Sequence, residues 1–341
     1  IPARTTIRRD ASIELPHVML LIDDRARTVI EPLAAQKSAY PVAYDHDLMQ
    51  GGGHIEGYFL SEDMQIAIGE ALDIYQGAPF CSPAVVHAGE YEDTADSDIV
   101  IITCGMARKP GMTRLDLAQV NVNILKDVAS NVTQYAPDAI YVIVSNPVDV
   151  LTYVFHKVSG LPERQIIGSG TILDTSRLQA ELARRFYISP KNVHAHVYGE
   201  HGDSSFVPWS LATIANNHVD SYKENSPDRD RIVWNREYDE VEAFVKKSGG
   251  LIIENKGATF YAVSISVCRI CKALLSGIDT TLTVSTMLHG EYGIDDVCLS
   301  LLNIVGNKQV QGKILLPLNE QEIWSLNKSA ESLKNVIRQI E

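Results

Sequence analysis

The 341-residue sequence has few features that would place it at a membrane or on nucleic acid. No apolar run approaches the roughly 18 residues that a membrane helix needs, and the first residues lack the continuous apolar stretch of a signal peptide. Basic residues are scarce: 30 Lys and Arg stand against 43 Asp and Glu, a formal net charge of −13. This balance argues against a nucleic acid or an anionic membrane as the main partner. We expect a cytoplasmic protein that binds a small molecule.

Cysteine is also sparse, with five residues that do not suggest a disulfide framework. Cys268 and Cys271 form a C-x-x-C pair, but they lie within VSISVCRICKALL, an apolar segment typical of one buried helix. We therefore predict two small core residues there and neither a redox centre nor a zinc site. A reducing compartment is the expected setting.

A third absence concerns the first sixty residues, where no G-x-G-x-x-G occurs. That motif normally follows the first strand of a dinucleotide-binding domain, because its glycines let the backbone approach a pyrophosphate at a helix N-terminus. The segment TVIEPLAAQ is also a poor central strand, since Glu31 and Pro32 interrupt it. The segment HVMLLIDD (17–24) is a better strand, yet no glycine loop follows it.

From residue 97 onward, strand and helix patterns alternate. Short apolar, β-branched runs at 98–103 and 139–144 predict buried strands. Apolar residues at three- and four-residue steps predict a helix over 117–132, and Asn146-Pro147 opens another that ends at Gly160. This order predicts an α/β fold with a doubly wound, mostly parallel Rossmann-type sheet. Ligands of such sheets bind beyond the carboxyl ends of the strands.

The second half of the chain is less regular and predicts an α+β arrangement. We expect two domains, at 1–165 (with 1–60 atypical) and at 166–341. The elements expected in the second domain are a strand at 193–198, helices at 228–248 and 258–276, strands at 280–287 and 296–305, and a terminal helix at 318–340.

Four segments, CGMARKPGMTRLDL, SNPVDVLTY, GSGTILDTSR and GEHGDSSFVPW, in this order and at these intervals, resemble the L-lactate/L-malate dehydrogenase family. The resemblance runs from about residue 62 to the C-terminus and is closest to the bacterial lactate enzymes. It implies an NAD-dependent 2-hydroxy-acid dehydrogenase that forms a homo-oligomer, in this family a homotetramer. It also implies a dinucleotide-binding domain at 1–165 and a catalytic domain at 166–341.

The chemistry of four residues agrees with this resemblance. His201 is a suitable proton donor because imidazole titrates near neutral pH, and Asp174 would orient it. Arg177 follows Asp174 by three residues on one helix face, where a guanidinium could grip a carboxylate through two parallel hydrogen bonds. Arg114 ends a Gly/Pro loop that could close and polarise the carbonyl group.

The resemblance implies further site residues. Asn146 would form a hydrogen bond near the substrate oxygen, and Thr259 would line the substrate pocket. The residues implied to bind NAD are Thr103, Gly105, Met106, Ser145, Asn146, Ser61 and Tyr91.

Arg108 stands at the position that separates lactate from malate enzymes in this family. An arginine there is typical of malate dehydrogenases, and a buried guanidinium without an anionic partner is costly. The segments GSGTILDTSR and GEHGD, and Thr259 in KGATFYA, are instead typical of lactate dehydrogenases. We therefore predict reversible reduction of pyruvate to L-lactate, with oxaloacetate and L-malate as the alternative.

Two other site hypotheses compete with this interpretation. One is a metal site, for which the candidate ligands are His194, His196, His201 and Asp203; two histidines one residue apart on a strand share a face. The motifs around these residues match the dehydrogenase family, and nothing else in the sequence supplies the framework of a metal-dependent hydrolase, so we expect no metal site. The other is regulation by fructose 1,6-bisphosphate, for which the family uses an arginine and a histidine. His194 matches the histidine, but Gln179 replaces the arginine.

The atypical N-terminal segment leaves three interpretations open. Counted without gaps, the glycine positions hold Gln36, Ser38 and Pro41, and Ser61 replaces the acid that receives the adenosine ribose. The segment is an altered stretch on a real dehydrogenase, a divergent cofactor pocket, or the mark of a non-catalytic assembly subunit.

Overall fold

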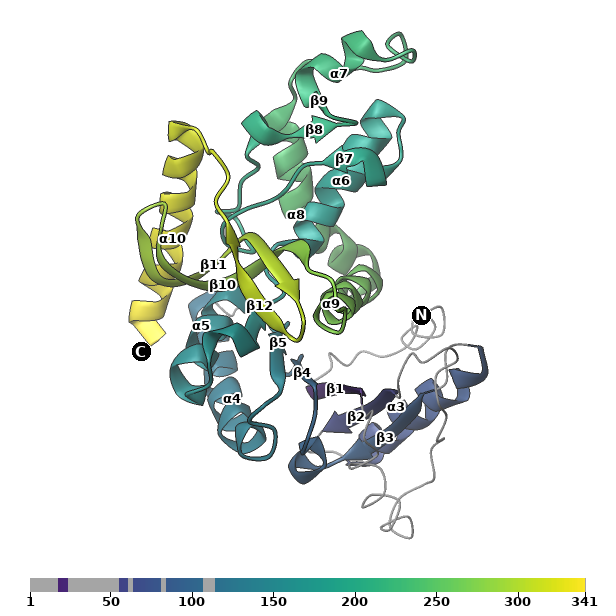
Figure 1. Ribbon diagram of the computed structural model, residues 1–341, viewed down its shortest axis with the longest axis vertical. Coiled ribbons are helices and arrows are strands. Elements are labelled where there is room, and N and C mark those ends of the chain that lie inside the picture. Colours follow the sequence, from purple (N-terminus) through teal and green to yellow (C-terminus); the bar gives the residue numbers. More distant parts are fainter. Residues whose placement is uncertain (1–17, 24–54, 61–63, 81–83, 107–113, 341) are drawn as a thin grey trace. The chain divides into compact units, whose positions relative to one another are not determined.

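The computed structural model describes residues 18–23, 55–60, 64–80, 84–106 and 114–340. The chain divides into two compact units (Figure 1). Unit 1 comprises residues 1–146 and 154–167, and unit 2 comprises residues 147–153 and 168–341.

The strands of unit 1 form one mixed sheet in the order β6-β5-β4-β1-β2-β3. Strands β4 and β5 are parallel, as are β2 and β3, whereas β1 runs antiparallel to both of its neighbours. The strands are β1 Val18–Asp23, β2 Ile55–Leu60, β3 Val85–Gly89, β4 Ile99–Ile102, β5 Ile140–Ile143 and β6 Ile166–Gly168. The expected strand within 17–24 is confirmed as β1, whereas TVIEPLAAQ lies outside the described residues.

The centre of this sheet is apolar because its strands are covered on both faces. Every residue of β4 and β5 is buried, as expected of strands in a parallel α/β sheet. The helices of unit 1 are α3 Met64–Gln76 and α4 Arg114–Tyr135, and α5 Val148–Ser159 begins in unit 2 and ends in unit 1. Gly160 ends α5 with a φ of +66°, a left-handed conformation that favours glycine. The predicted strand–helix–strand–helix order from residue 97 is confirmed.

Unit 2 is built on three antiparallel strands in the order β10-β11-β12, of which β10 and β11 are long. They are β10 Thr280–Glu291, β11 Ile294–Gly306 and β12 Gln309–Ile314. In this ladder Ser285 of β10 lies opposite Ser300 of β11 and also pairs with Gly168. The central residues of β10 and β11 are buried, so the two serines are held in a rigid frame.

The remaining elements of unit 2 precede this ladder along the chain, except for α10, which follows it. A small sheet contains β7 Val193–His194, β8 Thr213–Ile214 and β9 Asn217–His218. The helices are α6 Ile172–Phe186, α7 Val219–Asn225, α8 Tyr238–Lys256, α9 Tyr261–Leu274 and α10 Glu320–Ile340. Cys268 and Cys271 lie on α9, in the helix predicted from their segment.

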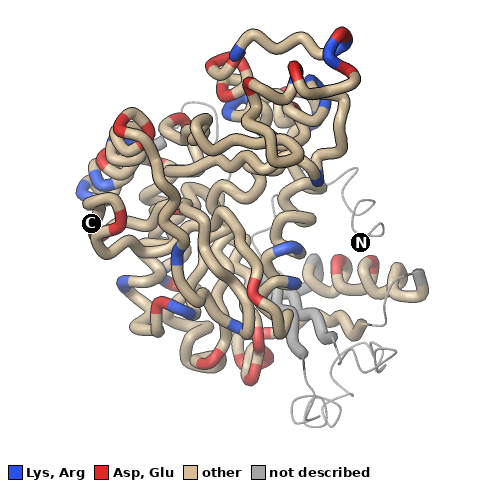
Figure 2. The backbone as a smooth tube through the Cα atoms, turned by 45° about the horizontal axis from the view of Figure 1, so that its top comes forward, with Lys and Arg blue, Asp and Glu red and all other residues tan. Residues whose placement is uncertain are grey.

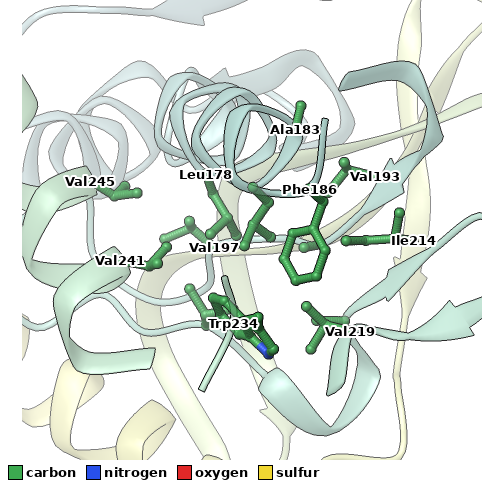
Figure 3. Packing of buried hydrophobic residues seen from close by; sticks show 14 of the residues in the cluster. Leu178, Ala183, Phe186, Val193, Val197, Ile214, Val219, Trp234, Val241 and Val245 are labelled. Atoms are coloured by element: carbon green, nitrogen blue, oxygen red, sulfur yellow. The ribbon is translucent and has the colours of Figure 1, made fainter. Parts of the chain in front are cut away.

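A buried cluster fixes α6 within unit 2 (Figure 3). Leu178, Leu182 and Phe186 recur along one face of α6 and are each at most 1% exposed, so the helix is amphipathic. Phe186 packs on Trp234 with ring centroids 5.1 Å apart. This apolar face anchors the helix, whose first turn carries Asp174.

Two predicted elements of unit 2 are wrong in extent. The helix expected at 228–248 begins only at Tyr238, because Arg236 has a φ of +65° that a helix cannot accommodate. The strand expected at 193–198 covers two residues. Beyond it, side chains of α6 satisfy the backbone: Thr175 Oγ1 accepts from the Val197 N–H, and Gln179 Nε2 donates to the Ala195 carbonyl.

Charged residues of both signs are interspersed along the described chain (Figure 2). Basic and acidic residues follow one another on the helices of unit 2, for example Arg184, Arg185 and Glu181 on α6. Within the part of the chain that the structure describes, no helix is long and apolar enough to cross a membrane.

Candidate functional site

Helix α6 places Asp174 and Arg177 side by side. Asp174 lies in the first turn of the helix, where the positive end of the helix dipole favours a carboxylate. The Nη1 atom of Arg177 donates to Asp174 Oδ1 over 2.9 Å, and the two side chains are only 14% and 7% exposed. Gly249 of α8 lies close by, since a Cβ atom there would be 3.5 Å from Arg177 Nη2. The expected i,i+3 pair is therefore a sheltered ion pair.

His201 lies on a loop that forms hydrogen bonds with strand β11. Gly199 exchanges backbone hydrogen bonds of 3.0 and 3.1 Å with Ser300 of β11. Its φ is +91°, and a Cβ atom would lie 2.7 Å from Ser329 Oγ, so only glycine fits this turn. The His201 ring follows two residues later with Nδ1 2.5 Å from Asp174 Oδ2.

The carboxylate of Asp174 thus bridges the two cations of the site. One oxygen contacts the imidazole of His201 and the other contacts the guanidinium of Arg177. Because of this bridge, displacing the Asp174 side chain would shift the imidazole of His201 and the guanidinium of Arg177 together.

The electrostatics of this trio favour the charged form of His201. The negative charge of Asp174, its hydrogen bond and the charge of Asp149 raise the pKa of His201 to about 9, although burial and Arg177 oppose this rise. Burial alone would raise the pKa of Asp174, but the charge and hydrogen bond of His201, together with Arg177, lower it below its ordinary value. At neutral pH the site therefore holds an imidazolium, a carboxylate and a guanidinium.

The two serines that face each other on β10 and β11 position both sides of this trio. Ser300 Oγ accepts from the N–H of Thr171, which precedes α6, over 3.0 Å. Ser285 Oγ donates to Asp149 Oδ1 over 2.6 Å, and Asp149 Oδ2 accepts from the backbone N–H of His201 over 2.7 Å. The sheet therefore sets the position of the helix that carries Asp174 and of the loop that carries His201.

In unit 1, five of the candidate cofactor residues lie at the carboxyl ends of β4 and β5. Asn121 of α4 joins the two strand ends through hydrogen bonds. Its Oδ1 accepts from the Met106 N–H over 2.6 Å, and its Nδ2 donates to the carbonyl groups of Met106 and Asn146 over 3.2 and 2.7 Å. Ser145 Oγ donates to the carbonyl group of Cys104. Thr103 is partly buried at the end of β4.

A glycine lets the backbone turn at this edge close to the Asn121 amide. Gly105 has a φ of +154°, and a Cβ atom there would meet the Asn121 amide at 3.2 to 3.4 Å. A dinucleotide that binds beyond the strand ends would lie against this turn. Thr103, Gly105, Met106, Ser145 and Asn146, which the resemblance implies to bind NAD, all lie at this edge.

Several predicted site residues cannot be placed against this geometry. Ser61 and Arg108 lie outside the described residues, as does the side chain of Arg114, the first residue of α4. The glycine-loop positions Gln36, Ser38 and Pro41 also lie outside them. Tyr91 begins a short 3-10 helix in unit 1.

The remaining candidates lie in unit 2. Thr259 is partly buried in the short connection between α8 and α9. His194 is exposed on β7, whereas His196 is partly buried, and the described residues contain no group of three or more potential ligands that could hold a metal. The candidate metal ligands are therefore not assembled.

Sequence reasoning missed Asn121, Asp149 and the serine pair. Asp149 had one detectable signal, since it is an acid in the first turn of a helix that follows a predicted site strand. Asn121 is 3% exposed in an otherwise apolar helix face, and a buried amide needs a partner. Ser285 and Ser300 had no local signal, because their contacts join segments more than a hundred residues apart.

Family models match both halves of the chain. The lactate/malate dehydrogenase NAD-binding domain matches residues 58–168, and the lactate/malate dehydrogenase alpha/beta C-terminal domain matches residues 171–341. The chain therefore belongs to the lactate/malate dehydrogenase family. The resemblance and the α/β fold expected from the sequence are confirmed.

Individual relatives and solved structures agree with this assignment. L-lactate dehydrogenase 1 of Clostridium acetobutylicum is 45% identical over 294 residues, which cover 86% of this chain and 93% of the relative. An L-lactate dehydrogenase of Clostridium botulinum is 42% identical over 318 residues, which cover 93% and 98%. The minor L-lactate dehydrogenase of Enterococcus mundtii has a TM-score of 0.80 at 35% identity, with 86% of this chain and 92% of that chain covered.

Proposed function

We propose that the protein is an NAD-dependent L-lactate dehydrogenase that converts pyruvate, NADH and a proton into L-lactate and NAD⁺. The observation that carries this proposal is the Asp174 carboxylate, which binds the His201 imidazole and the Arg177 guanidinium at once. A proton donor and a cation linked in this way suit a substrate that has a carbonyl group next to a carboxylate. The names of the relatives, all lactate dehydrogenases, favour pyruvate as the substrate.

In this mechanism Arg177 holds the substrate carboxylate and His201 holds the proton. When bound, the nicotinamide supplies the hydride that attacks the carbonyl carbon. The Nδ1–H of protonated His201 donates to Asp174, so the proton on Nε2 is the one given to the carbonyl oxygen. Because the pKa of His201 is raised to about 9, the donor stays protonated at neutral pH. Asp174 stabilises the imidazolium and keeps the ring oriented.

The residues implied by the family complete this proposal. Arg114 would close over the carbonyl group and stabilise the negative charge that develops on its oxygen. Asn146 would donate to the same oxygen, and Thr259 would line the pocket. The nicotinamide would lie against Gly105 at the ends of β4 and β5.

Arg108 supports a second candidate, the reduction of oxaloacetate to L-malate. A guanidinium there could pair with the second carboxylate of a dicarboxylic acid. The two candidates separate when NADH oxidation is measured with pyruvate and with oxaloacetate in parallel. We expect a higher kcat/KM with pyruvate. A far higher kcat/KM with oxaloacetate, reversed in Arg108→Gln, would contradict the lactate proposal.

The absence of G-x-G-x-x-G supports a third candidate of another class, a non-catalytic assembly subunit. NADH titration followed by its fluorescence distinguishes it, because an enzyme binds NADH saturably and an assembly subunit does not. Intact-mass measurement tests whether residues 1–60 are present as written. Ser61 followed by two acidic residues, Glu62 and Asp63, favours NAD over NADP.

We also propose that the enzyme works in the cytoplasm as a homotetramer without bound metal. The features that support the assembly are apolar side chains exposed on α8 and α9, among them Phe244, Ile253 and Ile265. Light scattering on the purified protein measures the assembly. Gln179 in place of an arginine predicts no activation by fructose 1,6-bisphosphate, which kinetic assays with and without that compound can check.

A further inference from the structure

A second carboxylate, that of Asp149, also contacts His201. It binds the backbone N–H of the histidine, whereas Asp174 contacts the ring. Asp149 lies in the first turn of α5 and is 2% exposed. Its Oδ2 accepts from the backbone N–H of His201 over 2.7 Å, and its Oδ1 accepts from Ser285 Oγ over 2.6 Å. The proposed reaction does not use this group. Its role therefore needs a separate explanation.

We propose that Asp149 is a positioning residue that fixes the backbone of His201 and, through its negative charge, favours the protonated imidazole needed for reduction. This proposal rests on the lactate dehydrogenase function. Asp174 acts on the imidazole ring, whereas Asp149 acts on the peptide from which the ring projects. The two carboxylates thus constrain the histidine at both ends of its side chain.

The geometry supports the backbone role. Asp149 is held by a helix whose first turn also satisfies the carboxylate through its dipole, and by Ser285, which is fully buried at the centre of β10. Both anchors are parts of regular elements. His201, by contrast, lies on a loop, so the hydrogen bond from its N–H to Asp149 joins the loop to α5 and β10.

The charge of Asp149 is costly for folding, which is unexpected for a purely structural group. Burial raises the pKa of Asp149 to about 6, although the hydrogen bonds from Ser285 and from the His201 backbone and the charge of His201 lower it, and Glu200 adds a small rise. A carboxyl group whose folded pKa exceeds its unfolded pKa loses stabilisation as pH rises through the folded value. Above about pH 6 the ionised group therefore destabilises the fold relative to a neutral one.

The same charge helps the chemistry. Asp149 raises the pKa of His201, after the larger effects of Asp174. Among the described residues, two further charged groups lie near the histidine: Arg177 on α6, which opposes this rise, and Glu200 next to it on the loop. Strands β10 and β11 contribute the neutral hydroxyl groups of Ser285 and Ser300.

Asp149→Asn separates charge from geometry. The asparagine Oδ1 can still accept from the His201 N–H, and its Nδ2 can donate to Ser285 Oγ. We expect the alkaline limb of kcat/KM for pyruvate reduction to move to lower pH by about one unit, because His201 loses its proton earlier. The melting temperature at pH 7 should equal or exceed that of the wild type, because a buried charge has been removed.

Ser285→Ala is the matched control, since it keeps the carboxylate and removes only the donor to Oδ1. Its alkaline limb should stay with that of the wild type. The proposal would be overturned if the alkaline limb of kcat/KM in Asp149→Asn coincided with that of the wild type. It would also be overturned if Ser285→Ala shifted this limb as much as Asp149→Asn does. A lower melting temperature of Asp149→Asn at pH 7 would also overturn it, because the carboxylate would then be a structural requirement.

NMR titration of ¹⁵N-labelled histidine provides a readout that does not depend on turnover. The His201 signal is assigned by its loss in His201→Gln, and its pKa is compared between the wild type and Asp149→Asn. A lower pKa in the variant supports the proposal, and an unchanged pKa overturns it. If the wild type reduces neither pyruvate nor oxaloacetate, the proposed function fails while this titration still decides the role of Asp149.

Discussion

The candidate residues of the two units are held by different physical means. In unit 2, charged side chains contact one another directly: Asp174 binds His201 and Arg177, and Asp149 binds the backbone of His201. In unit 1, the described edge depends on backbone shape, with Gly105 at the turn and one amide, Asn121, joining the ends of β4 and β5. We expect the charged contacts in unit 2 to affect the protonation of His201, and the backbone contacts in unit 1 to affect the binding of NADH. Variants in the two units should therefore alter different kinetic constants.

The largest effect is expected from His201→Gln. Glutamine has no titrating proton, so kcat for pyruvate reduction should fall by about 10² to 10⁴-fold, the usual contribution of a general acid. Steady-state assays measure this fall, and NADH titration checks that cofactor binding is kept. His194→Gln, which changes an exposed histidine on β7, is the control. Equal activity losses in both variants would contradict the role of His201.

A smaller effect is expected from Arg177→Lys. Lysine keeps the charge but loses the planar fork that holds a carboxylate through two hydrogen bonds. We expect kcat/KM for pyruvate to fall about 10- to 100-fold, mainly through a higher KM. Arg184→Lys on the same helix is the control, because that side chain is 70% exposed. An unchanged KM would show that Arg177 does not grip the substrate.

The smallest effect is expected in unit 1, from Asn121→Ala. This change removes the hydrogen bonds to Met106 and to the Asn146 carbonyl group, so the dissociation constant for NADH should rise about tenfold. Asn123→Ala, at an exposed position two residues further along α4, should bind NADH as the wild type does. If Asn121→Ala instead lowered kcat and left NADH binding unchanged, the contrast between the units would fail.

The sequence predicted those site contacts whose partners lie close together along the chain or within a recognisable motif. Asp174 and Arg177 are three residues apart on one helix, so their pairing follows from helical periodicity, and the motif around His201 identified its partner. Strands β4 and β5 were also predictable, because apolar β-branched runs have few alternatives.

Contacts that depend on tertiary structure could not be predicted. Ser285 meets Asp149 across 136 positions of the chain, and nothing local distinguishes that serine from others on β10. The strand expected over 193–198 failed for the same reason, since side chains of α6 took the backbone partners that a neighbouring strand would have supplied.

The pH dependence of kcat/KM for pyruvate reduction, compared between the wild type and Asp174→Asn, tests most directly whether Asp174 links the proton donor to the carboxylate grip. The folded-state pKa of His201 is raised to about 9, so reduction by the wild type should persist below that pH and fall as pH rises through it. In Asp174→Asn the fall should begin at lower pH, and the KM for pyruvate should rise at every pH because Arg177 has lost its partner. A wild-type limb near the ordinary histidine pKa of about 6.5, unmoved in Asp174→Asn, would contradict this link.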